Sequence, residues 1–126
     1  MLATARLQTL VLTADVAGAR QFYTEILGLR LKGESLGALV YDVGGGDLRV
    51  SPVPCVQPSE HTVFGFAVAD LDATVAEMAS RGLQSERIAG LPHDERGVVA
   101  VPDGSRVIWL RDPDGNLLSV VQYATK

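Results

Sequence analysis

Hydrophobic and polar residues follow two different periods along this chain, one typical of strands and the other of helices. Short runs rich in β-branched and aromatic residues predict strands, and apolar residues with helical spacing predict two helices. The predicted strands cover Leu7–Thr13, Leu29–Lys32, Ala38–Val43, Leu48–Val53, Thr62–Val68, Leu83–Ile88, Val107–Leu110 and Leu117–Val121. The predicted helices cover Val16–Leu27 and Leu71–Arg81. Each follows an aspartate that can cap it and ends at a glycine that can stop it.

The last two predicted strands flank the turn sequence Asp112-Pro113-Asp114-Gly115-Asn116. Proline fixes φ and glycine accepts a positive φ, so this stretch is typical of a tight turn between antiparallel strands. If the whole stretch forms the turn, the register pairs Arg111 with Leu117, Trp109 with Ser119 and Val107 with Val121. Because side chains alternate between faces, Trp109 and Ser119 should share one face, and Leu118 and Val120 the other.

The order strand, helix, strand, strand, strand occurs twice. Aligning Asp15 with Asp70 also aligns Gly28 with Gly82 after one gap, and a glycine-containing turn precedes the last strand of each copy. We interpret this pattern as an internal duplication. The sequence therefore predicts an α+β fold for a single domain over residues 1–126. One βαβββ module covers residues 1–56 and a second covers residues 60–126, each a curved sheet with its helix outside.

The more apolar face of each predicted sheet should pack on its helix. These helix-side residues are Leu48, Val50, Phe64, Phe66, Val68, Leu118 and Val120. The opposite, less apolar faces carry Arg49, Ser51, Val53, His61, Val63, Gly65, Ala67, Leu117, Ser119 and Val121. We expect the second set to line concave surfaces, and two such sheets facing each other would enclose a cavity for a ligand.

The composition narrows the range of partners. The chain has 126 residues, 47% of them hydrophobic, enough for a real core. The formal charge of −4 and the lack of a basic run argue against a nucleic-acid partner, and no stretch approaches a membrane-spanning length. Cys55 is the only cysteine, which excludes an internal disulfide. The opening residues do not resemble a signal peptide, so the expected location is the cytoplasm.

Several motifs along the chain together resemble the vicinal oxygen chelate (VOC) superfamily. They are Leu12-Thr13-Ala14-Asp15, Phe22-Tyr23 with Leu27-Gly28-Leu29, Val68-Ala69-Asp70-Leu71, and Arg111 through Asn116. This superfamily contains glyoxalase I, extradiol dioxygenases, fosfomycin-resistance enzymes and bleomycin-resistance proteins. The resemblance implies paired βαβββ modules and, usually, a homodimer with two cavities.

Metal-dependent members of that superfamily hold a divalent metal through four positions on the concave strands. By the resemblance, these positions fall here on Gln8, on Val50 or Ser51, on Val63 and on Ser119. Valine has no lone pair, and a neutral serine is a poor ligand for Fe, Ni, Zn or Mn. Only Gln8 could coordinate well, so we expect no metal and no other cofactor.

Two histidines leave an alternative metal site open. His61 precedes Val63 by two residues and should point to the same face, and His93 stands beside Asp94 and Glu95. No nucleophilic constellation is visible, because no histidine or acid can be placed beside either candidate serine.

Three hypotheses about function follow. The first is a metal-independent protein of the glyoxalase/bleomycin-resistance type that binds a small organic ligand, for example to sequester a drug or metabolite. Its ligand-binding residues would be Gln8, Tyr41, Arg49, Ser51, His61, Val63, Trp109 and Ser119, with Tyr41 and Trp109 offering stacking surface and no catalytic residue. The second is a glyoxalase-like lyase, isomerase or dioxygenase with a divalent metal at a non-standard site. The third is a dimer that serves only as an interaction module.

Overall fold

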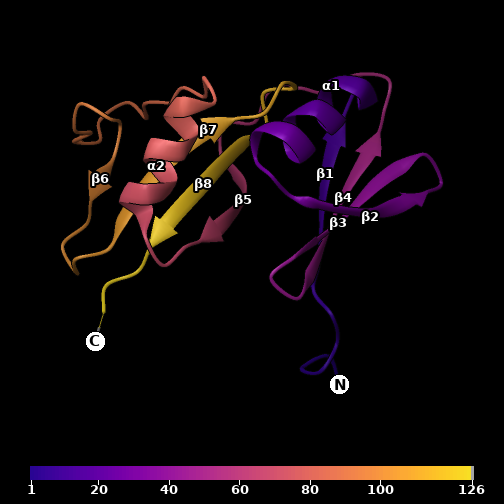
Figure 1. Ribbon diagram of the computed structural model, residues 1–126, viewed down its shortest axis with the longest axis horizontal. Coiled ribbons are helices and arrows are strands. Elements are labelled where there is room, and N and C mark those ends of the chain that lie inside the picture. The colour runs from indigo at the N-terminus through magenta and orange to yellow at the C-terminus, as the bar shows by residue number, and fades with distance from the viewer. Residues whose placement is uncertain (126) are drawn as a thin grey trace. The chain divides into compact units, whose positions relative to one another are not determined.

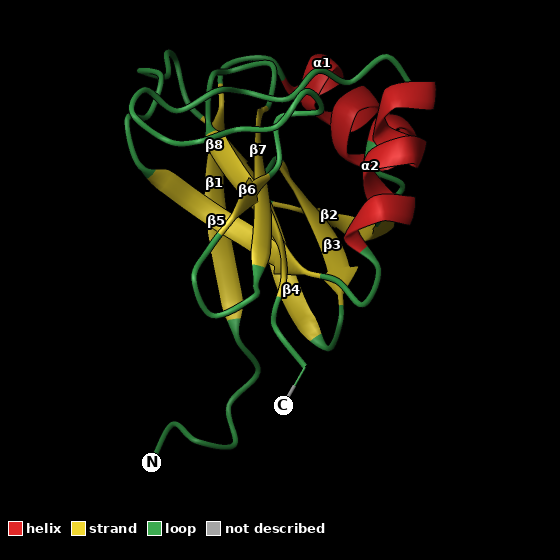
Figure 2. Cartoon of the chain, turned by 90° about the vertical axis from the view of Figure 1, so that its left-hand side faces the viewer, coloured by secondary structure: helices red, strands yellow, loops and turns green. Residues whose placement is uncertain are grey.

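The computed structural model describes residues 1–125 and divides the chain into two compact units (Figure 1). The first unit comprises Met1–Pro58 together with Pro113–Asn116, and the second comprises Ser59–Asp112 and the chain from Leu117 onward. Each unit contains one four-stranded sheet and one helical segment, which confirms the predicted α+β class (Figure 2). No helix within residues 1–125 is long and apolar enough to cross a membrane.

The first unit is built on a mixed sheet. Its strands are β1 (Gln8–Thr13), β2 (Arg30–Ser35), β3 (Ala38–Val43) and β4 (Gly46–Pro52), in the order β1-β4-β3-β2. β1 runs parallel to β4, and the other neighbours are antiparallel. The turn between β3 and β4 is only Gly44 and Gly45, both with positive φ, as tight hairpin turns require. Because the turn is so short, β4 begins before the predicted start at Leu48.

The helix predicted over Val16–Leu27 has two parts. α1 covers Val16–Arg20, and a π-helical segment, η1, covers Gln21–Ile26. As predicted, the side chain of Asp15 caps the start by accepting a backbone hydrogen bond from the first turn. Gly28 follows the helical segment with a φ of 70°, the conformation expected of a glycine stop.

The π-helical segment carries two large aromatic residues into the core of the first unit. Phe22 and Tyr23 are both buried, and their rings meet edge to face with centroids 5.1 Å apart. Both aromatic residues of this segment therefore belong to one core. Tyr41 on β3 lies against Tyr23, is 0% exposed, and has its hydroxyl 2.8 Å from Thr24 Oγ1. The prediction that Tyr41 offers stacking surface to a ligand is therefore wrong, because its ring belongs to the core beneath the helix.

The second unit repeats the strand order of the first. Its elements are β5 (Thr62–Ala67), α2 (Leu71–Ser80), β6 (Val99–Ala100), β7 (Arg106–Arg111) and β8 (Leu117–Gln122), with the sheet order β5-β8-β7-β6. β5 runs parallel to β8, as β1 does to β4. Asp70 caps α2 through a 3.0 Å hydrogen bond from Ala73 N, and Gly82 follows with a φ of 77°. The two units therefore share one topology, and the duplication itself stays a prediction.

The hairpin register predicted from the turn sequence is confirmed. β7 and β8 pair Arg111 with Leu117, Trp109 with Ser119 and Val107 with Val121. On the helix side, Leu118 and Val120 are buried with Ile108 and Leu110. Phe64 shares this face but is only half-buried, since β5 is an edge strand.

The turn between β7 and β8 is anchored within the first unit. Asp114 Oδ1 accepts a 2.8 Å hydrogen bond from Ala14 N, and Asn116 Nδ2 donates a 2.9 Å hydrogen bond to Leu12 O. Gly115 has a φ of 85°, and a Cβ there would stand 2.9 Å from Pro58 Cβ. The polar turn residues therefore bind backbone groups rather than merely facing solvent.

The strand predicted over Leu83–Ile88 is wrong. This segment makes only an isolated bridge to the sheet, between Glu86 and Trp109. Ile88 N donates its hydrogen bond to His93 Nε2 at 2.8 Å, so this backbone group is satisfied within the loop. The short strand β6, which the sequence pattern does not predict, instead pairs with the outer side of β7.

Candidate functional site

On the face of the second sheet opposite α2, one row across three strands contains a large, a small and an absent side chain. Trp109 on β7 pairs with Ser119 on β8, and Ser119 pairs with Gly65 on β5. The next row along the same face consists of Val107, Val121 and Ala67. We call this surface the open face of the second unit, defined by Thr62, Gly65, Ala67, Val107, Trp109, Ser119 and Val121.

A hollow of about 380 Å³ lies on the open face. Its volume falls within the range of about 300–1,000 Å³ that is usual for small-molecule sites. It is lined by Thr62, Val101, Asp103, Ser105, Arg106, Val107, Trp109, Ser119, Val121 and Tyr123. Aromatic and valine side chains provide most of this lining, and hydroxyl groups provide several of the polar atoms. We call this feature the open-face hollow.

Trp109 is held in place by two side chains. Its Nε1 donates a 3.2 Å hydrogen bond to Thr62 Oγ1, and the ring of His93 packs against the indole at a steep angle of 69°, with centroids 6.0 Å apart. Its backbone oxygen accepts a 2.8 Å hydrogen bond from Glu86 N. The indole is only half-buried, so an oriented aromatic surface faces the hollow.

The absence of a side chain at Gly65 leaves room for the Ser119 side chain beside Trp109. A Cβ built at Gly65 would collide with Ser119 Oγ and would stand 3.0 Å from the Ser119 carbonyl oxygen. The Ser119 hydroxyl therefore occupies space that any other residue at position 65 would fill. Small side chains therefore stand next to the indole across β8 and β5, and we call Gly65 and Ser119 the floor.

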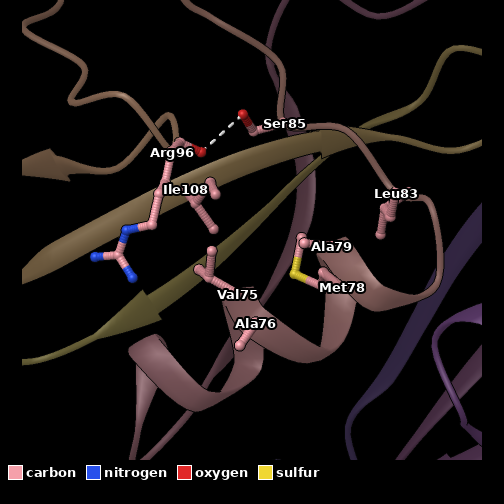
Figure 3. Close-up of a pocket in the computed structure, with 8 residues that line it drawn as sticks. All are labelled: Val75, Ala76, Met78, Ala79, Leu83, Ser85, Arg96 and Ile108. Carbon is pink, nitrogen blue, oxygen red and sulfur yellow. Dashed lines mark hydrogen bonds between the residues drawn. The ribbon is translucent and has the colours of Figure 1, made fainter.

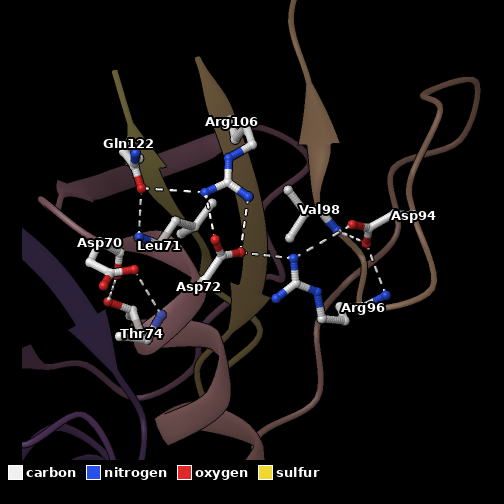
Figure 4. A network of polar contacts seen from close by, with 10 residues as sticks. Asp70, Leu71, Asp72, Thr74, Asp94, Arg96, Val98, Arg106 and Gln122 are labelled. Atoms are coloured by element: carbon white, nitrogen blue, oxygen red, sulfur yellow. Dashed lines mark hydrogen bonds and ion pairs between the residues drawn. The ribbon is translucent and has the colours of Figure 1, made fainter. Parts of the chain in front are cut away.

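Arg106 on β7 contributes to the lining of the hollow, but its guanidinium group is bound on the helix side of the sheet. Arg106 donates to both carboxylate oxygens of Asp72 on α2, at 3.0 and 3.2 Å, and also to Gln122 Oε1 at 3.4 Å (Figure 4). Arg96 adds a 2.9 Å hydrogen bond to the same carboxylate. These guanidinium groups, Arg106 first, lower the pKa of Asp72 to about 2.

Asp103 is the other charged residue of the lining. It lies in the turn between β6 and β7, where its Oδ1 accepts a 2.8 Å hydrogen bond from Ser105 N. That backbone hydrogen bond is the main reason why the pKa of Asp103 lies below its usual value. The turn residue therefore places a carboxylate at the rim of the hollow.

A second, smaller hollow of about 220 Å³ lies on the helix side of the same unit (Figure 3). Val75, Met78 and Ala79 of α2 face it from one side, and Ile108 of β7 lies opposite. A hydrogen bond of 3.0 Å from Ser85 Oγ to the Arg96 carbonyl closes one side. This space is an apolar gap between helix and sheet and contains none of the predicted ligand-binding residues.

The predicted residues of the second unit do not all meet at the hollow. Trp109 and Ser119 line it, whereas His61 is exposed before the start of β5. Val63 sits at a register shift between β5 and β8, and the bulge brings Thr62 into the lining in its place.

His93 is not arranged as a metal ligand. Its Nε2 accepts the hydrogen bond from Ile88 N, and its Nδ1 lies 2.7 Å from the Gly97 carbonyl oxygen, to which it donates in the corresponding neutral tautomer. Both ring nitrogens are thus used by the loop. Within residues 1–125, no three side chains of the histidine, cysteine, aspartate and glutamate types form a group that could hold a metal ion.

The predicted residues of the first unit lie on the face of its sheet opposite α1. Strand register places Gln8, Arg49 and Ser51 on that face, while Val50 is buried on the helix side. Between the two positions considered for the third metal ligand, Ser51 therefore shares a face with Gln8. Arg49 donates a 2.8 Å hydrogen bond from Nη2 to the Ser35 carbonyl oxygen.

Sequence analysis missed several residues of the hollow. Val101, Asp103 and Ser105 lie in the connection between β6 and β7, and Tyr123 directly follows β8. Of these, Tyr123 could have been suspected, because it continues the alternation of Ser119 and Val121 on the same face.

Two βαβββ units, each a four-stranded mixed sheet with a helical segment on one face, define the fold class of this chain. The chain belongs to the Glyoxalase/Bleomycin resistance protein/Dioxygenase superfamily, whose model matches residues 6–120. This match confirms the resemblance seen in the sequence motifs.

Individual relatives agree with this assignment. The uncharacterized protein YaeR of Escherichia coli is 29% identical over 124 residues, covering 83% of this chain and 85% of the relative. A glyoxalase/bleomycin resistance protein/dioxygenase from Alicyclobacillus acidocaldarius has a TM-score of 0.72 at 20% identity, over 97% of this chain and 93% of that one. Lactoylglutathione lyase from Agrobacterium tumefaciens has a TM-score of 0.68 at 20% identity, over 94% and 93%. At such identities the structural likeness establishes the fold alone.

Proposed function

We propose that this protein is a metal-independent small-molecule-binding member of its superfamily, and that it sequesters an organic ligand such as a drug or metabolite. The observation that carries the proposal is the open-face hollow, which combines an oriented indole, a low floor at Ser119 and an apolar wall. Such a site suits binding of a ligand without covalent chemistry. Trp109, Ser119 and Thr62 are its central ligand-binding residues.

The residues at the expected metal positions support the metal-independent half of the proposal. Ser51 and Ser119 offer neutral hydroxyl groups, and Val63 offers no donor atom. Gln8 alone is a poor basis for binding Fe, Ni, Zn or Mn, which take imidazole, carboxylate or thiolate ligands. The alternative ligand His93 already uses both ring nitrogens within its loop.

We expect the purified protein to contain Fe, Ni, Zn and Mn only at substoichiometric levels, and chelator treatment to leave its melting temperature unchanged. The physical reason is that neutral hydroxyl and aliphatic side chains cannot offset the dehydration of a divalent cation. Elemental analysis and thermal unfolding before and after chelation measure both quantities. One tightly bound metal per chain, lost in a Gln8→Ala variant, would contradict the proposal and favour the glyoxalase-like enzyme instead.

A thermal-shift screen of small organic molecules tests the binding half of the proposal. A ligand that binds the folded state stabilises it by RT ln(1 + c/Kd), where c is the free ligand concentration, so the melting temperature should keep rising as c is increased. A protein that only mediates interactions would show no such shifts.

We also propose that the protein forms a homodimer. Leu10 and Leu12 on β1 are 51% and 40% exposed, an apolar surface that a second copy of the chain would cover. Sedimentation at micromolar concentration should therefore give the mass of two chains. A clean monomer under the same conditions would count against the dimer and would leave the ligand-binding proposal in place.

A further inference from the structure

Beside Trp109, the open-face hollow presents small side chains. Ser119 and Val121 line it, and their β5 neighbours Gly65 and Ala67 add no bulky side chain next to them. Trp109 stands opposite Ser119 on the neighbouring strand, and its ring is oriented by Thr62 and His93. A planar ring system can therefore lie on the floor while it contacts the indole, whereas a bulky branched group would lose one of these contacts.

The positive charge at the hollow is already used within the chain. The guanidinium of Arg106 forms a two-point ion pair with Asp72 and a further hydrogen bond to Gln122. Drawing it towards a ligand would break the paired hydrogen bonds that hold the start of α2 to β7 (Figure 4). An anionic ligand would consequently find no cation here without breaking an existing ion pair.

The negative charge at the hollow, on Asp103, is not used in an ion pair among the described residues. The carboxylate of Asp103 accepts a hydrogen bond from the adjacent turn, but its side chain carries no ion pair among the described residues and stands at the rim. Its field adds to the formal charge of −4 of the whole chain. Both terms disfavour approach of an anion.

The remaining polar groups are hydroxyls. Ser119 and Tyr123 line the hollow and can each donate or accept one hydrogen bond to a neutral substituent. Tyr123 is 67% exposed and lies at the end of β8, where its ring adds a second aromatic surface.

We propose that the open-face hollow binds an uncharged, planar aromatic molecule carrying a hydroxyl or similar neutral group, and that it discriminates against anionic molecules of the same shape. This inference rests on the proposed binding function and adds the chemical class of the ligand. It identifies Trp109 as the stacking residue, Gly65 and Ser119 as the floor, and Asp103 as the residue that excludes anions.

Two probes of matching ring size test the inference by isothermal titration calorimetry at neutral pH. 2-Naphthol is uncharged, and 2-naphthoate carries a carboxylate at the same ring position. We expect the neutral probe to bind the intact protein with a dissociation constant at least about tenfold lower than that of the anion. Equal affinities or tighter binding of 2-naphthoate would overturn the inference.

Asp103→Asn isolates the charge contribution. Asparagine can still accept the hydrogen bond from Ser105 N, so the turn should be retained. We expect the dissociation constant of 2-naphthoate to fall by about threefold in this variant, an effect on the scale of one exposed charge, with 2-naphthol unchanged. An unchanged affinity for 2-naphthoate would remove Asp103 from the proposal.

Gly65→Ala tests the floor, with Gly33→Ala as its matched control. A Cβ at Gly65 collides with Ser119 Oγ, whereas a Cβ at Gly33 meets nothing within 4 Å. We expect the first variant to lose at least about tenfold in affinity for 2-naphthol and the second to bind as the wild type does. If Gly65→Ala does not fold, Ser119→Val serves as the second variant, because it raises the floor from the β8 side.

The outcomes separate this inference from the proposed function. A protein that binds neither probe overturns the inference, and the thermal-shift screen then decides whether another small molecule occupies the hollow. A protein that contains a stoichiometric metal overturns the proposed function, whichever probe it prefers.

Discussion

Replacing Trp109 with alanine is expected to weaken the binding of 2-naphthol by about 1–3 kcal/mol, the usual cost of losing an aromatic anchor. The indole is half-buried, oriented by Thr62 and His93, and adjacent to the low floor at Ser119. The substitution removes this surface without opening the main core, which lies on the other side of the sheet. Calorimetric titration of the variant and the wild type measures the difference.

The single tryptophan provides an independent readout of the same site. Because Trp109 is the only tryptophan, quenching or a shift of its fluorescence by a planar ligand reports binding at that ring. Trp109→Phe is the matched control: it retains an aromatic face, loses the hydrogen bond to Thr62, and should keep most of the affinity. If Trp109→Ala fails to fold while a bound ligand leaves the wild-type fluorescence unchanged, the side chain is a packing residue and the site assignment fails.

The fold was largely predictable because its strongest determinants are local. Asp15 and Asp70 cap their helices, and the Asp112–Asn116 turn sets the register of the final hairpin. The strand predicted over Leu83–Ile88 failed because periodicity does not show how backbone groups are satisfied. Ile88 N bonds to the His93 side chain within the loop, and only Glu86 bridges to the sheet.

The candidate site was predictable only in its centre. Alternation along a hairpin of known register places Trp109 and Ser119 on one face without any further information. A bulge cannot be recognised from alternation alone, so Val63 was predicted at a position that Thr62 occupies. Tyr41 was misplaced for a different reason: Ala38–Val43 is apolar on both faces, and its pattern does not reveal which face meets the helix.

Trp109→Ala is expected to weaken ligand binding, whereas Tyr41→Ala is expected to destabilise the fold. We expect a loss of about 3–5 kcal/mol in the free energy of unfolding, as for other large aromatic residues removed from a core. Tyr41 is 0% exposed, packs on Tyr23 with centroids 6.0 Å apart, and is bonded to Thr24 through its hydroxyl. Urea unfolding followed by circular dichroism measures the loss.

Tyr41→Phe separates the hydroxyl from the ring and keeps the second prediction testable if the alanine variant does not fold. The phenylalanine retains the packing on Tyr23 and loses only the 2.8 Å hydrogen bond to Thr24, so we expect a loss of about 1 kcal/mol in stability. Because the ring lies in the core of the first unit and is not among the residues that line the open-face hollow, the affinity of the folded variant for 2-naphthol should equal that of the wild type. A variant of normal stability that no longer binds the probe would return Tyr41 to the ligand site and would require a binding surface on the helix side of the first sheet.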